Sequence, residues 1–151
     1  MEAETREERM SSTNLDPSYG SNPVDLVEQI ASLNNWYFER SDKDEISFFI
    51  SGESVDYQAS FQWIDDIGVL HLACAFDVIV PEHQRDEMIK LLAFINQQMW
   101  VGHFDLWPDE GLVMYRHALL LAGGAEANTE QCKALLRNAV EAIERWFLQD
   151  P

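Results

Sequence analysis

The stretch from Pro81 to Gly124 most constrains how this chain can fold, because it encodes a helix and two strands in immediate succession. Pro81 suits the first turn of a helix, since no backbone donor is needed there, and Glu82 adds a favourable charge at that end. Apolar residues then recur at helical spacing: Met88, Leu92, Ile95 and Met99, with Ile89, Leu91 and Ala93 widening the stripe. We therefore expect an amphipathic helix that buries this stripe and ends before Gly102.

Two strand-like runs follow that helix, and a turn at residues 108–111 joins them. The first run spans residues 103–107 and the second extends from Leu112 to Leu121. If Trp107 pairs with Leu112, side-chain alternation divides the hairpin into two faces. The apolar face carries Phe104, Leu106, Val113, Tyr115, His117, Leu119 and Leu121. The opposite face carries His103, Asp105, Trp107, Met114, Arg116 and Leu120.

The remaining elements complete an α+β pattern. Asn22 is suited to cap a helix that begins at Pro23, and strand-like segments follow near residues 36–40, 45–51, 57–64 and 69–80. A last helix starts at Asn128 or Thr129, and its apolar residues continue at helical spacing to Phe147. The order α-β-β-β-β-α-β-β-α predicts a curved antiparallel sheet flanked by helices that lie mainly on one face.

Three runs in this part of the chain resemble the bacterial YbjN family: Leu91-Leu92-Ala93-Phe94-Ile95-Asn96, Gly102-His103-Phe104-Asp105-Leu106 and Asp109-Glu110-Gly111-Leu112-Val113-Met114-Tyr115-Arg116. The resemblance implies a fold like that of type III secretion chaperones, with a curved antiparallel sheet flanked by helices. It also implies a role in regulating sensory transduction, and it brings no active site.

Composition limits the size of the fold and the choice of partners. With 151 residues, 46% of them hydrophobic, the chain suits one domain over residues 22–151, and residues 1–21 have too few apolar side chains to order, so we expect a disordered acidic tail. A net charge of −17 argues against nucleic acid and anionic membranes as partners. Solubility is the ordinary explanation for such acidity, and a basic protein partner is the alternative.

No apolar run is long enough to span a membrane, so we expect a cytoplasmic protein.

No catalytic, cofactor or metal site is predicted. His103 and Asp105 share one strand face, and His117 would join them only if the hairpin register slipped by one residue. Paired carboxylates fall in turns, where they remain in water and keep little catalytic value. Cys74 and Cys132 lie on apolar faces and are interpreted as reduced core thiols. We therefore expect a protein that is not an enzyme.

Large apolar residues on the noncore side of the hairpin remain to be explained. The candidate protein-interface residues are Trp100, Trp107, Met114, Arg116 and Leu120, and aromatic, Met and Arg side chains are enriched in interface cores. We predict a regulatory or chaperone-like protein that binds another protein through its sheet face or sheet edge. We also predict a homodimer that uses the outward face of the hairpin and the exposed flank of the preceding helix.

The alternative is a small-molecule sensor or cryptic enzyme. Its pocket would lie between the helices and the curved sheet, lined by Phe61, Trp63, Phe76 and Tyr115.

Overall fold

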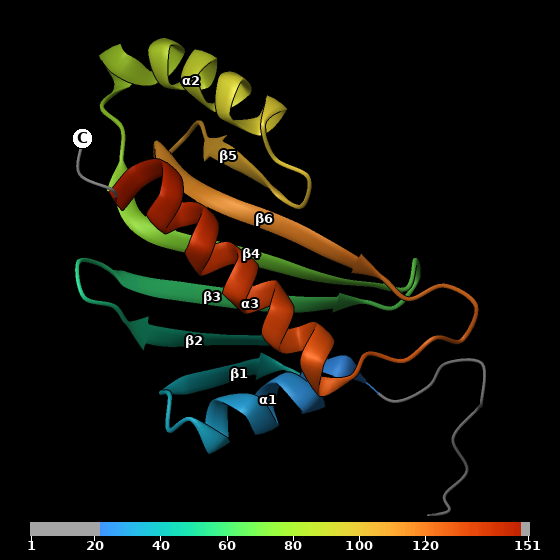
Figure 1. Ribbon diagram of the computed structural model, residues 1–151. Helices are drawn as coiled ribbons and strands as arrows, with labels where there is room; N and C mark the ends of the chain where they lie inside the picture. Colours follow the sequence, from blue (N-terminus) through green and yellow to red (C-terminus); the bar gives the residue numbers. More distant parts are fainter. Residues whose placement is uncertain (1–21, 149–151) are drawn as a thin grey trace, which may run out of the picture.

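The computed structural model describes residues 22–148, which form one six-stranded antiparallel sheet with helices around it (Figure 1). The elements are α1 (Pro23–Leu33), β1 (Phe38–Asp42), β2 (Glu45–Ser51), β3 (Asp56–Ile64), β4 (Val69–Ile79), the 3₁₀ helix η1 (Glu82–Gln84), α2 (Arg85–Gln97), β5 (His103–Trp107), β6 (Leu112–Leu120), α3 (Thr129–Ile143) and the π-helix η2 (Glu144–Leu148). The predicted order of helices and strands is confirmed. The predicted acidic tail, residues 1–21, lies outside the described residues.

The sheet has one face covered by helices and one face without them. Its strand order is β1-β2-β3-β4-β6-β5, so β6 lies between β4 and the edge strand β5. Helix α3 packs on β4 and β6, and α1 packs on β2, β3 and α3 (Figure 1). We call this side of the sheet the covered face and the other side the open face. The covered face holds the core, in which Phe48, Phe61 and Tyr115 are fully buried.

The β5–β6 hairpin has the register that the sequence predicts, with Trp107 opposite Leu112 and Phe104 opposite Tyr115. Phe104 and Tyr115 therefore both point into the core, where their ring centroids lie 5.7 Å apart. The Phe147 ring of η2 lies 5.0 Å from Phe104 and 5.1 Å from Phe76. This aromatic cluster joins the C-terminal helix to the hairpin.

Gly102, which precedes β5, meets both a conformational and a steric requirement. Its φ of +70° is rarely adopted by residues with a side chain, and a Cβ there would lie 2.1 Å from the Tyr115 hydroxyl oxygen. That hydroxyl donates a hydrogen bond of 3.2 Å to the Val101 carbonyl. Burial raises the pKa of Tyr115 to about 12, so the hydroxyl stays protonated as a donor. The glycine thus lets the chain enter β5 over a buried tyrosine.

Helix α2 lies at the edge of the sheet beside β5 rather than over a face (Figure 1). Of its predicted apolar stripe, Leu92 and Ile95 are buried, whereas Ile89, Leu91 and Ala93 are exposed. The prediction that these three residues widen the buried stripe is wrong. One narrow edge strand covers only the centre of an apolar helix face, so the flanks remain in water.

β1 and β4 also differ from the sequence prediction. β1 begins at Phe38 rather than at residue 36, because Asn35 turns the chain with a φ of +58° and Trp36 stacks on Phe48 with 5.3 Å between ring centroids. β4 is continuous, but its pairing with β6 shifts register between Ala75 and Ile79, where Asp77 adopts a φ of +69°. This irregularity is a β-bulge.

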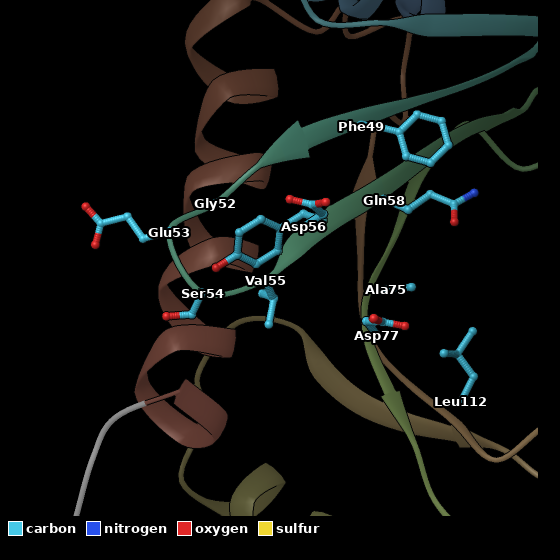
Figure 2. Close-up of a pocket in the computed structure, with 11 residues that line it drawn as sticks. Phe49, Gly52, Glu53, Ser54, Val55, Asp56, Gln58, Ala75, Asp77 and Leu112 are labelled. Atoms are coloured by element: carbon cyan, nitrogen blue, oxygen red, sulfur yellow. The ribbon is translucent and has the colours of Figure 1, made fainter.

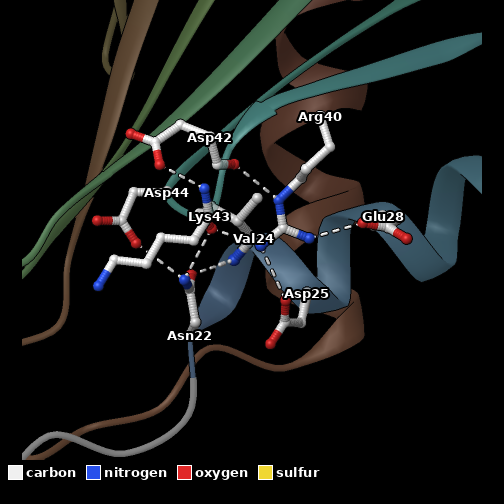
Figure 3. A network of polar contacts seen from close by, with 8 residues as sticks. All are labelled: Asn22, Val24, Asp25, Glu28, Arg40, Asp42, Lys43 and Asp44. Atoms are coloured by element: carbon white, nitrogen blue, oxygen red, sulfur yellow. Dashed lines mark hydrogen bonds and ion pairs between the residues drawn. The ribbon is translucent and has the colours of Figure 1, made fainter.

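Polar contacts fix α1 to the turn between β1 and β2 (Figure 3). The Asn22 side chain accepts from the Val24 N–H at 2.9 Å, which confirms the predicted cap, and its amide donates to the Lys43 carbonyl at 2.9 Å. The Arg40 guanidinium bonds Asp25 at 2.9 Å and Glu28 at 2.6 Å. At the start of α3, Asn128 and Gln131 form a capping box.

Candidate protein-binding surface

The open face of the sheet contains two adjoining hollows, which together we call the open-face groove. The turn-end pocket, of about 630 Å³, is lined by Phe49, Gly52, Glu53, Ser54, Val55, Asp56, Tyr57, Gln58, Ala75, Asp77 and Leu112. The central pocket, of about 450 Å³, is lined by Glu45, Gln58, Ser60, Gln62, Ile64, His71, Ala73, Ala75, Trp107, Leu112, Met114 and Arg116. Both share Gln58, Ala75 and Leu112, so the groove crosses β3, β4 and β6 without a break.

Strand alternation explains why the groove is hollow. The residues of β4 that face away from the core include Ala73 and Ala75, whose short side chains leave the floor low. Larger side chains stand on either side: Phe49 on β2, and Trp107 on β5. Phe49 is itself supported by Tyr37, with 6.1 Å between the ring centroids. The groove is therefore a low strip between two aromatic walls.

Arg116 is the centre of a polar network in the central pocket. Its guanidinium bonds the Asp105 carboxylate at 3.0 Å, and its Nε donates to His71 Nε2 at 3.1 Å. Burial, the Arg116 charge and the nearby His103 lower the pKa of His71, in that order of size. His71 is therefore a neutral acceptor at pH 7, and the single positive charge here is already balanced by Asp105.

The turn-end pocket is formed by the tight β2–β3 turn and the bulge in β4 (Figure 2). Gly52 is required in that turn, because a Cβ there would lie 2.4 Å from the Val55 carbonyl oxygen and 2.8 Å from the Tyr57 ring. Figure 2 shows Asp56 on β3 and Asp77 on β4 beside the hollow, with Phe49 and Gln58 along its length and Leu112 beyond Asp77. Side-chain alternation along β4 places a charged residue, Asp77, at this surface.

The structure brings together three of the five predicted interface residues: Trp107, Met114 and Arg116 all line the central pocket. Trp107 is 44% exposed and Arg116 is half-buried. Met114, however, is only 3% exposed, so the expectation that it lies open on the surface is wrong. It stands on an interior strand, β6, with Ala75 of β4 on one side and Asp105 of β5 on the other.

The other two predicted residues lie away from the groove. Trp100 is 97% exposed in the segment that precedes β5, while Trp107 is at the far end of that strand. Leu120 is 66% exposed at the end of β6, roughly 27 Å along the strand from the Trp107–Leu112 pair. The five residues therefore do not form one continuous patch.

Sequence reasoning missed several groove residues, above all Gln58, Ala75 and Asp77. One signal was available: the polar side chains of Gln58, Ser60 and Gln62 alternate with core residues on β3. Such alternation marks a face without helices, but it does not say whether that face is flat or hollow.

The two edges of the sheet are poor sites for an added strand. At Phe104 the β5 edge is closed by Asn96 of α2, whose amide donates to the Phe104 carbonyl at 3.0 Å and accepts from its N–H at 2.8 Å. The β1 edge is five residues long, includes charged Glu39 and Arg40, and shifts register after Arg40. Short, charged and irregular edges discourage strand pairing.

Of the three side chains considered for metal binding, His117 lies on the opposite face of the sheet from His103 and Asp105. His117 lies on the covered face, opposite Leu72, and its Nδ1 is buried without a hydrogen-bond partner. His103 and Asp105 belong to the open face, where Asp105 bonds Arg116. Within residues 22–148, no three His, Cys, Asp or Glu side chains are grouped so that they could hold a metal ion.

The covered face holds two buried thiols. Cys74 and Cys132 are buried and free, and burial raises their pKa to about 12 and about 11. Phe61, Phe76 and Tyr115 are fully buried in the core, and Trp63 packs against that core. The pocket that the small-molecule alternative places at these four residues stays a prediction.

A shallow cleft of about 300 Å³ does lie between α1 and α3, and it is lined by Ile30, Asn34, Trp36, Ile50, Lys133, Leu136, Arg137 and Val140. None of the helices in residues 22–148 is long and apolar enough to cross a membrane.

Comparison with solved structures assigns the fold class. A chain of the crystal structure of the ExsC–ExsE complex matches with a TM-score of 0.53 and 16% identity, over 81% of this chain and 88% of that chain. The crystal structure of YbjN from E. coli, described as "a putative transcription regulator", matches with a TM-score of 0.57 and 15% identity, over 81% of this chain and 86% of that chain. ExsC is a type III secretion chaperone, so the domain has a type III secretion chaperone-like α+β fold.

The family follows from the sequence itself. The profile of the YbjN family, "Putative bacterial sensory transduction regulator", matches residues 23–149. The protein belongs to the YbjN family, as the sequence resemblance predicted. No curated protein matches the chain.

Proposed function

We propose that this protein is a non-enzymatic regulator that binds another protein in its open-face groove. The observation that carries the proposal is an uncovered sheet face with two adjoining hollows and exposed aromatic walls at Phe49 and Trp107. Exposed aromatic side chains that border a recess are common anchors for a partner protein. The family description, a regulator, and the chaperone-like fold support a binding role.

The face is a better candidate than the edge. Asn96 occupies the backbone groups of β5 at Phe104, and β1 is short and charged. A partner segment would therefore be held by side chains of the groove, such as Gln58 and Gln62, rather than by a continued strand ladder.

The test compares two charge substitutions of exposed apolar residues. Trp107→Asp places a carboxylate on the groove wall, and the control Ile67→Asp does the same in the β3–β4 turn, where Ile67 is 62% exposed. Both variants should remain folded by circular dichroism. Affinity capture from a native lysate should return a stoichiometric partner with the unaltered protein and with Ile67→Asp, but not with Trp107→Asp. Equal loss in both variants, or no stoichiometric partner at all, would rule the proposal out.

We also propose a homodimer whose contact is the apolar side of α2 rather than Met114. Exposed apolar residues on one side of this helix, Leu91 and Phe94, are followed by exposed Trp100 and Val101 in the segment after it. Burying such area gains roughly 25 cal/mol per Å², and a twofold axis lets one patch complement itself. The charge of −17 per chain opposes association, so the dimer should tighten as salt screens the repulsion.

Sedimentation velocity at high micromolar concentration and moderate salt tests the dimer. Leu91→Asp with Phe94→Asp should give folded monomers, while Trp107→Asp should stay dimeric. A monomeric unaltered protein under these conditions would refute this part of the proposal.

We further expect a cytoplasmic location, because two free thiols suit a reducing compartment.

The small-molecule alternative now rests on the α1–α3 cleft. Its apolar lining and the Lys133 and Arg137 side chains would suit a small anionic amphiphile. A ligand of that class that raised the melting temperature would support this function.

A further inference from the structure

The turn-end pocket carries an unbalanced negative charge. Glu53, Asp56 and Asp77 line it, and no Lys, Arg or His of the described segment, residues 22–148, does. The ion pairs among residues 22–148 do not involve these carboxylates: they join Arg40 to Asp25 and Glu28, Lys90 to Glu87, and Arg116 to Asp105. The central pocket adds Glu45 and only one guanidinium, which Asp105 already balances. Along the whole groove, a cationic occupant would therefore meet net attraction.

The apolar lining of the turn-end pocket fits the rest of a basic side chain. Phe49, Val55, Ala75 and Leu112 line the hollow between the carboxylates. Lysine and arginine bury an aliphatic stem against apolar surface while the charged head reaches a carboxylate. An exposed aromatic ring such as Phe49 adds attraction for a cation placed over its face.

The charge of the whole molecule acts in the same direction. A net charge of −17 draws a basic segment toward the protein and repels an acidic one. The uncharged Gln58, Ser60 and Gln62 of β3 line the central pocket, Gln58 also lines the turn-end pocket, and all three offer donors and acceptors to a peptide backbone. Trp107, at the far wall, offers a contact for an apolar side chain.

We propose that the open-face groove binds an extended, basic segment of a partner protein, which inserts a lysine or arginine side chain into the turn-end pocket and an apolar side chain against Trp107. This inference rests on the proposed function and names the chemistry of its partner. It gives the acidic composition a binding role in addition to solubility.

The probe is a capped hexapeptide of alternating lysine and leucine, compared with its glutamate–leucine counterpart. Binding is measured by fluorescence anisotropy and mapped by amide chemical shifts. The site variant is Asp56→Asn with Asp77→Asn, and asparagine tolerates the positive φ of residue 77. The control variant, Asp65→Asn with Asp66→Asn, removes the same charge from the β3–β4 turn at the other end of β3.

The basic peptide should bind and shift the amides of Gln58, Ala75 and Asp77, and the acidic peptide should not. The site variant should weaken binding by about tenfold, whereas the control should change it less than about twofold, because Coulomb attraction falls with distance and is screened by salt. Equal weakening by both variants would show attraction to the overall charge only and would overturn the inference, as would equal binding of the two peptides.

The captured partner separates this inference from the proposed function. If Trp107→Asp abolishes capture but the Asp56→Asn and Asp77→Asn variant retains the partner fully, the groove binds a protein whose chemistry is not basic at the turn-end pocket. In that case the inference fails and the proposed function stands. If the site variant loses the partner and the control keeps it, both are supported.

Discussion

The two faces of the sheet are made from the same strands but differ in what their side chains contact. On the covered face, Phe48, Phe61 and Tyr115 are fully buried beneath α1 and α3. On the open face, Ala73 and Ala75 form a low floor, and the aromatic Phe49 and Trp107 stay partly in water. Large side chains therefore stabilise the domain on one face and remain partly exposed to solvent on the other.

Aromatic side chains on the covered face contact one another, whereas the charged side chains on the open face lack some of their partners among the described residues. Rings on the covered face contact one another, as Phe48 does with Trp36 at 5.3 Å and Phe61 at 6.0 Å between centroids. On the open face the charges of the described residues are only partly matched: Arg116 has Asp105, but no Lys, Arg or His of residues 22–148 lines the pocket of Asp56 and Asp77. Incompleteness of this kind is expected of a binding surface.

The largest expected effect comes from two neighbouring phenylalanines on opposite faces. Phe48→Ala should cost about 3–5 kcal/mol of unfolding free energy, because it opens a cavity in the core. Phe49→Ala should cost less than about 1 kcal/mol, because Phe49 is 44% exposed and its ring stacks on the exposed Tyr37. Urea denaturation of both variants measures the contrast. Similar losses for the two would show that the open face is part of the core.

A smaller effect is expected at the sheet edge, where the two faces meet. Asn96→Ala should cost about 1–3 kcal/mol, because it leaves the N–H and C=O of Phe104 without partners on a residue that is 2% exposed. The neighbouring Gln97→Ala is the matched control, since Gln97 is exposed and should change stability by less than about 0.5 kcal/mol. Equal urea midpoints for the two variants would contradict the proposed edge closure.

Local patterns were enough to predict much of the fold. Alternation on β6 predicted which of its residues face the core, and the turn at residues 108–111 predicted the pairing of Trp107 with Leu112. Both signals act over a few residues, so the sequence carries them directly.

The candidate site depends on contacts between distant segments, and these were not predictable. Met114 is on the expected face, but its burial depends on neighbours contributed by β4 and β5. The exposure of Leu91 follows from the position of α2 beside a single edge strand, which the width of an apolar stripe does not reveal. The turn-end pocket requires the bulge at Asp77 and the placement of β6 next to β4.

The smallest expected effect is a pH dependence that compares one histidine on each face. Burial lowers the pKa of His117 on the covered face, with a smaller contribution from His103, and burial and Arg116 lower the pKa of His71 on the open face. In the unfolded chain both should titrate near about 6.5. Below that pH the unfolded state binds more protons than the folded state, so stability present above about pH 6.5 is lost as pH falls toward the lowered values.

The His117→Leu variant should therefore lose less stability than the unaltered protein between pH 7.5 and pH 5.5, as measured by urea midpoints. It also removes the buried Nδ1 that has no hydrogen-bond partner, so it should not be destabilised at pH 7.5. His83→Leu, in the exposed η1 turn, is the control for the replacement of a histidine by leucine. The His71→Leu variant separates the faces further: it should also flatten the pH dependence, but it leaves Arg116 without its Nε acceptor and should lower stability at pH 7.5. If the pH dependence were unchanged in both the His117 and the His71 variants, neither histidine would contribute to the loss of stability at low pH.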